Sequence, residues 1–249
     1  DRLNPIYVCK LQFVRRRAAK AFKPDELAAA DGPALRREVE ALIGATLDEL
    51  SFARAVMGWL EDEEAHADKL NAAARFAAWA TLSEEGKHRY RKSPLFHLPE
   101  KIDPDHLVEV ATEVIEGVTM LKAPAHHLRL REGFALTDHG MDLEGALDQA
   151  NYCIFCHNQG KDSCSKGLKE KDGSFKTSAT NVTLAGCPLD EKISEMNLLK
   201  AQGHGLAALA VAMVDNPLCA ATGHRICNDC MKACIYQKQQ PVDIPQIET

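Results

Sequence analysis

Cysteine is the residue type with the greatest chemical potential in this chain. Eight of the nine cysteines lie between Cys153 and Cys234, and only Cys9 lies outside this region. Spacing divides them into two groups: Cys153-x2-Cys156-x7-Cys164 with the distant Cys187, and Cys227-x2-Cys230-x3-Cys234 with Cys219 upstream. Thiols at such spacings can bind zinc or an iron–sulfur cluster, and Cys153 to His157 also has the Cys-x-x-Cys-His form of a haem attachment site.

An iron–sulfur interpretation accounts for the largest share of these thiols. Haem would leave the other six cysteines of the region unexplained. Zinc bound by four thiolates, or by three and an imidazole, fits either triplet and would give a structural module without a redox role. In two-cluster ferredoxins, a cysteine that precedes proline ligates the other cluster. Cys187, which precedes Pro188, is therefore expected to join the second triplet (Cys227, Cys230 and Cys234), leaving the first triplet (Cys153, Cys156 and Cys164) without a fourth ligand.

Helices are expected to position these thiols. Ala, Leu, Glu and Arg dominate residues 1–140, and apolar residues recur at helical spacing between Ala34 and Thr81. Further helices are predicted after Ser83, from Asp103 through Val118 until Ala123-Pro124 ends it, over 142–152, over 188–202 and over 206–214, and no strand is predicted. The 22 residues between Cys164 and Cys187 are polar and rich in lysine, which predicts a surface loop. The predicted fold is all-α, with a helical region over 1–140 and a cysteine-rich unit over 141–249.

The segment from Tyr152 to Glu248 resembles the N-terminal iron–sulfur domain of the glutamate synthase small subunit and of dihydropyrimidine dehydrogenase. The matching stretches are CIFCH, GCPLDEKISEMNLLKAQGHGLAALAVAMVDNPL, TGHRICNDCMKACIYQ and PVDIPQIE, about 100 of the 249 residues. The family usually has four residues between its second and third cysteines and three between its third and fourth. This chain has 7 and 22 there, so residues 165–186 are an insertion.

The resemblance implies an α-helical ferredoxin-like domain with two 4Fe–4S clusters. It also implies an oxygen ligand past the last cysteine, which places Glu248 as the fourth ligand of the first cluster; the alternative is Cys219. In this family, the domain relays electrons between a second redox site and an FAD- and NAD(P)H-binding domain that follows it. The chain is thus expected to be a fragment of a larger flavoprotein oxidoreductase, without turnover of its own.

Composition and charge indicate which partners and which cellular compartment the protein is expected to have. The net charge is −6, so neither nucleic acid nor an anionic membrane surface is expected as the main partner. The longest apolar run, Leu206 to Val214, is far shorter than the ~20 residues of a membrane span. Thiols concentrated in one part of a long chain predict a reducing compartment, the cytoplasm, rather than a secreted disulfide scaffold. The alternative function is a structural zinc module beside a helical region that binds another protein.

Overall fold

The computed structural model describes residues 4–125, 128, 130–136, 138–224 and 226–249. They form two compact units, Asp1–Pro99 and Glu100–Thr249. His126 and His127, which the sequence places at a surface turn, lie outside the described residues. The sequence-based boundary was expected near residue 140, whereas the structure groups residues 100–140 with the cysteine-rich unit.

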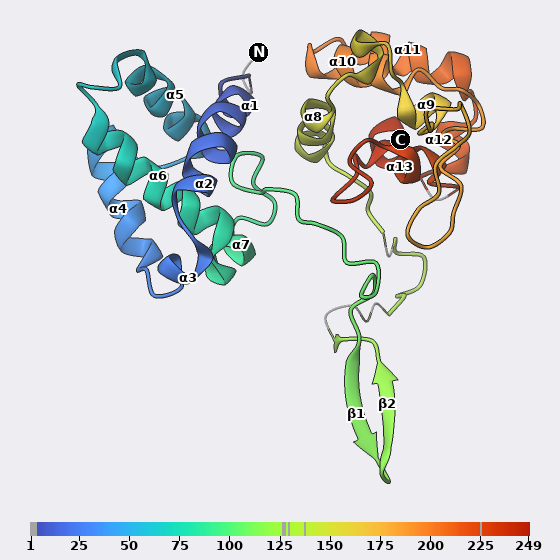
Figure 1. Ribbon diagram of the computed structural model, residues 1–249, viewed down its shortest axis with the longest axis horizontal. Coiled ribbons are helices and arrows are strands. Elements are labelled where there is room, and N and C mark those ends of the chain that lie inside the picture. Colours follow the sequence, from blue (N-terminus) through green and yellow to red (C-terminus); the bar gives the residue numbers. More distant parts are fainter. Residues whose placement is uncertain (1–3, 126–127, 129, 137, 225) are drawn as a thin grey trace. The chain divides into compact units, whose positions relative to one another are not determined.

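The N-terminal unit is helical throughout its regular structure (Figure 1). Its elements are α1 (Asn4–Cys9), the π-helix η1 (Lys10–Ala18), α2 (Ala19–Ala21), α3 (Pro24–Leu27), α4 (Gly32–Ile43), α5 (Glu49–Trp59), the short 3-10 helix η2 (Leu60–Asp62), α6 (Ala67–Leu82) and α7 (Glu84–Arg89). Polar side chains define the helix starts. The Asp31 carboxylate accepts from the Ala34 N–H (3.0 Å), and Ser83 Oγ accepts from the Gly86 N–H (3.0 Å). The helices predicted between Ala34 and Thr81 and after Ser83 are therefore confirmed.

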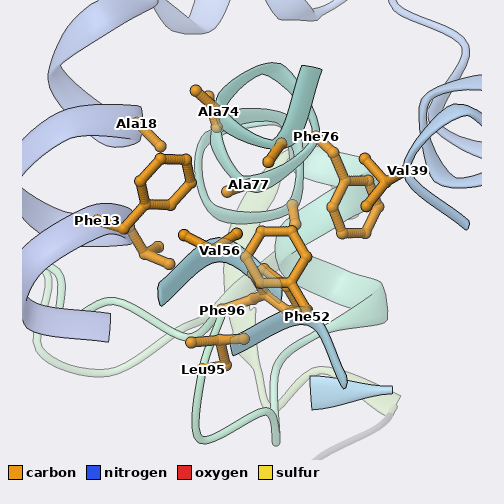
Figure 2. Packing of buried hydrophobic residues seen from close by; sticks show 14 of the residues in the cluster. Phe13, Ala18, Val39, Phe52, Val56, Ala74, Phe76, Ala77, Leu95 and Phe96 are labelled. Atoms are coloured by element: carbon orange, nitrogen blue, oxygen red, sulfur yellow. The ribbon is translucent and has the colours of Figure 1, made fainter. Parts of the chain in front are cut away.

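Aromatic side chains fill the centre of this unit (Figure 2). The Phe52 ring is fully buried and lies edge-on to Phe96, with ring centres 5.2 Å apart. The Phe76 ring on α6 contacts the Phe96 ring in the same way at 5.4 Å. Edge-to-face pairs of this kind stabilise a core beyond the area that they bury. The N-terminal unit thus has its own hydrophobic core.

Substitution of two glycines would test how tightly this core is packed. A Cβ atom added at Gly32 would lie 2.0 Å from the Trp79 ring, whereas one added at Gly58 would meet nothing within 4 Å. We expect Gly32→Ala to destabilise the unit by about 1–3 kcal/mol through overpacking. The matched variant Gly58→Ala, in an exposed helical position, should stabilise it by about 0.5–1 kcal/mol through helix propensity. Urea unfolding followed by tryptophan fluorescence measures both, and equal effects would contradict the packing described here.

The C-terminal unit begins with a β-hairpin where a helix was predicted. Strands β1 (Ala111–Ile115) and β2 (Val118–Lys122) pair antiparallel, with Ile115 opposite Val118. Glu116 and Gly117 form the turn with φ angles of 52° and 80°. Two consecutive residues with positive φ suit the tight turn that joins twisted strands, and the flanking Val, Ile and Thr residues favour strands. The predicted helix from Asp103 to Val118 and the all-α class are thus wrong here, although the chain is mostly helical.

The remaining elements of this unit are short helices (Figure 1). They are α8 (Leu143–Tyr152), η4 (Cys156–Gln159), α9 (Ser163–Lys166), α10 (Ile193–Ala201), α11 (Gly205–Asp215), α12 (Cys219–Thr222), α13 (Asp229–Ala233) and α14 (Ile244–Glu248). Helices α10 and α11 pack on each other, and α8 packs on α10. The helix predicted over 142–152 is confirmed as α8, whose start is capped by Asp142 (2.8 Å to the Gly145 N–H). Within the described ranges, no helix has the length and apolar character needed to cross a membrane.

Candidate metal centre

Four cysteines from separate elements line one pocket of the C-terminal unit. We call Cys153, Cys156, Cys164 and Cys234 the first thiol set. Cys153 directly follows α8, Cys156 begins η4, Cys164 lies in α9 and Cys234 directly follows α13. The rest of the lining is mainly apolar: Ile154, Ile193, Ile235, Tyr236, Val242 and Ile244, with Ser163, Ser194 and Asn197 as its polar members. Short helices thus bring four soft ligands to one largely apolar space.

The backbone between Cys153 and Cys156 turns sharply around the first sulfur. Phe155 adopts a left-handed conformation with a φ of 53°, which is uncommon for a residue with a side chain. This turn lets the Phe155 N–H donate to Cys153 Sγ at 3.4 Å. A backbone N–H that points at a sulfur stabilises its thiolate form, so the turn prepares Cys153 to act as a ligand.

The insertion over residues 165–186 begins and ends at neighbouring points of the backbone, so Cys164 lies close to Cys187. Gly167 and Gly186 both have positive φ, and a Cβ added at Gly186 would lie 2.5 Å from the Gly167 nitrogen. Only glycine permits this approach of two backbone segments. It allows the Cys187 N–H to donate to the Cys164 carbonyl at 2.8 Å. The 22 intervening residues therefore leave and return at one point, and the predicted surface loop does not separate the two cysteines.

Cys187, Cys227 and Cys230 form a second thiol set. The thiol of Cys230 interacts electrostatically with Cys187, Cys227 and the carboxylate of Glu248. Cys219 Sγ lies 3.8 Å from the Glu248 carbonyl oxygen and also interacts with the Glu248 carboxylate. Cys227 is exposed, whereas Cys187, Cys219 and Cys230 are buried. Both candidate fourth ligands, Glu248 and Cys219, therefore lie beside the second thiol set.

This partition differs from the predicted one at two residues. The sequence grouped Cys234 with Cys227 and Cys230, but Cys234 lines the pocket of the first thiol set. Glu248 was expected to complete that first set, but its carboxylate interacts with Cys187 and Cys230 of the second. The physical reason is α13, which spans only Asp229–Ala233 and has Cys230 inside it and Cys234 at its end. Its two thiols thus face different sets.

Burial disfavours the charged thiolate form of the cysteines that line the pocket. It raises the pKa of Cys156 to about 11, and the neighbouring Cys153 and Cys234 thiols act in the same direction. Burial likewise raises the pKa of Cys164, where Asp162 and Cys234 add to the effect. Because thiolate is the form that binds metal, protons must leave when metal enters. The positive charge of the metal reverses the local preference and makes the same buried sulfurs stable as thiolates.

Glu248 shares a buried carboxyl pair with Glu191. Burial, together with the neighbouring Glu191, raises the pKa of Glu248 to about 8. One carboxyl oxygen of Glu248 is buried and has no hydrogen-bond partner. Burial beside a second carboxyl favours the protonated form of Glu248, and a metal ion at this place would favour its deprotonation and take it as a hard oxygen ligand.

The described residues contain no group of three or more His, Cys, Asp or Glu side chains placed to hold a single metal ion. Each thiolate of a 4Fe–4S cube binds a different iron, so a cluster does not require three donors around one metal ion. His157 lies outside the pocket lining and is held by Ser194, whose Oγ accepts from the His157 N–H at 3.2 Å.

Sequence reasoning missed three polar residues of this pocket: Ser163, Ser194 and Asn197. Ser163 adjoins Cys164, and the other two lie on one face of α10, three residues apart. Serine and asparagine carry no motif that distinguishes a cluster neighbour from a surface residue. Only the helical periodicity of Ile193, Ser194 and Asn197 could have indicated a shared face.

These features define a mostly helical protein with a cysteine-rich C-terminal unit. The chain is 33% identical over 213 residues to uncharacterized protein RP005 of Rickettsia prowazekii, covering 79% of this chain and 68% of that protein. It belongs to the same family as RP005. A second match, to uncharacterized protein RP006 of the same organism, is 83% identical over 30 residues, 12% of this chain and 4% of that protein. No family model matches, and no solved structure matches.

Proposed function

We propose that this protein transfers electrons through two 4Fe–4S clusters. The observation that carries the proposal is the pocket lined by four thiols, Cys153, Cys156, Cys164 and Cys234. Four cysteines are the usual ligand set of such a cluster, and three of these four are buried, which would limit its contact with water. Its chemistry would be the gain and loss of one electron at a time.

The second thiol set would hold the other cluster. Cys187, Cys227 and Cys230 supply three thiolates, and Glu248 or Cys219 supplies the fourth ligand. The hydrogen bond between the Cys187 N–H and the Cys164 carbonyl joins one ligand of each set. This direct link would keep the two clusters adjacent, as a relay requires.

Resemblance to the glutamate synthase small subunit and dihydropyrimidine dehydrogenase supports the choice of partner. We infer that the clusters exchange electrons with an FAD- and NAD(P)H-binding domain, in the same polypeptide or complex, and with a further redox domain or subunit. Electron relay does not by itself convert a substrate, so the chain would act as part of a flavoprotein oxidoreductase. Nine free thiols are consistent with a reducing compartment such as the cytoplasm.

Anaerobic purification followed by metal and sulfide analysis tests this function. We expect about eight irons and eight acid-labile sulfides per chain, with a broad visible absorption that bleaches on addition of dithionite. Stoichiometric zinc without colour would instead establish the structural zinc module. A sharp Soret band would identify Cys153 to His157 as a haem site.

A further inference from the structure

Two polar side chains in the pocket of the first thiol set lack a nitrogen or oxygen partner. Asn197 is 0% exposed, and its amide nitrogen and amide oxygen make no hydrogen bond to another nitrogen or oxygen atom. Ser163 is 6% exposed, and its hydroxyl is also without a partner. Ser194, the third polar residue of the lining, differs because its hydroxyl is occupied by His157. Asn197 and Ser163 thus have unused hydrogen-bonding capacity inside the pocket.

Such groups are costly in a protein interior. Burial of an amide or hydroxyl without a hydrogen bond is unfavourable, and native proteins pair the large majority of these groups. The missing partner is expected among whatever occupies the pocket, because the walls around Asn197 offer mostly isoleucine, valine and sulfur. Burial raises the pKa of the Cys153 thiol overall, and a hydrogen bond from the Asn197 side chain acts against this rise, so the Asn197 amide faces the Cys153 sulfur.

We propose that Asn197, assisted by Ser163, donates hydrogen bonds to the sulfur atoms of the cluster held by the first thiol set and thereby raises its reduction potential. The inference rests on the function proposed above. Sulfides and thiolates of a cluster carry negative charge, which increases on reduction. A donor therefore stabilises the reduced form more than the oxidised form. Asn197 would thus be a positioning residue that adjusts the potential without binding iron.

The test is potentiometric titration of the purified protein, followed by electron paramagnetic resonance. Asn197→Leu keeps the approximate shape of the side chain and removes both polar atoms. We expect the equilibrium constant for reduction of the first cluster to fall about tenfold, which corresponds to a potential lower by ~59 mV for one electron. Ser163→Ala should lower it in the same direction but by less, since a second donor remains.

Two controls separate this effect from a general disturbance of the fold. The potential of the second cluster should stay unchanged in Asn197→Leu, because the pocket that Asn197 lines contains no thiol of the second set. Leu198→Ala changes the adjacent residue of α10, which does not line the pocket, and should leave both potentials unchanged. A merely structural role of Asn197 would instead lower cluster content at an unaltered potential.

The outcomes also distinguish this inference from the function on which it rests. If the wild-type protein contains neither iron nor acid-labile sulfide, both the proposed function and this inference are wrong. Full iron and sulfide in Asn197→Leu, with a wild-type potential, overturns only the inference. If Asn197→Leu fails to assemble the cluster, pulsed electron paramagnetic resonance of wild-type protein with 15N-labelled asparagine amides decides. A coupling between the reduced first cluster and an amide nitrogen supports the hydrogen bond, and its absence overturns it.

Discussion

Cys234→Ala should lose the first cluster and retain the second. Cys234 lines the same pocket as Cys153, Cys156 and Cys164, so its removal leaves three thiolates there. About half of the iron and sulfide, roughly four of each per chain, should remain. Cys9→Ala is the control, because Cys9 is buried in the core of the N-terminal unit and should not affect iron content.

Double variants make the grouping itself testable. Cys153→Ala with Cys234→Ala should lose no more iron than either single variant, since both residues serve one cluster. Cys230→Ala with Cys234→Ala should lose nearly all of it, since the two residues serve different clusters. Iron content and the signals of the reduced protein measure both. The opposite pattern would restore the grouping in which Cys230 and Cys234 share a cluster.

Spacing along the chain identifies the thiols but not their grouping. Cys230 and Cys234 are four residues apart, yet α13 ends between them, and Cys234 lines the pocket of the first thiol set whereas Cys230 does not. Conversely, 22 residues separate Cys164 and Cys187, whose backbones are hydrogen-bonded. Both facts depend on where a short helix stops and where two glycines let segments meet. Neither is encoded in a count of intervening residues.

Helix periodicity and caps were more informative than cysteine spacing. Asp31, Ser83 and Asp142 each precede a helix that the structure contains, because a side-chain oxygen satisfies the first free N–H groups. The error came at residues 111–122, where the apolar pattern was interpreted as helical. Glu116-Gly117 between β-branched residues was the local signal for a hairpin. Helical periodicity over a short segment cannot outweigh such a turn.

Phe52→Ala should destabilise the N-terminal unit by about 3–5 kcal/mol and leave the clusters intact. Phe52 is 0% exposed and contacts the rings of Phe13, Phe76 and Phe96 (Figure 2), so truncation leaves a cavity among three aromatic rings. The same substitution at Phe134, which is 98% exposed, should change stability by less than about 0.5 kcal/mol.

Two separate signals allow each unit to be followed in one urea titration. Both tryptophans, Trp59 and Trp79, belong to the N-terminal core, so their fluorescence reports on that unit alone. Visible absorption of the proposed clusters would report on the C-terminal unit. In Phe52→Ala, the fluorescence transition should move to lower urea while the absorption transition stays in place, because each unit has its own core. A joint shift of both transitions would mean that the two units unfold as one.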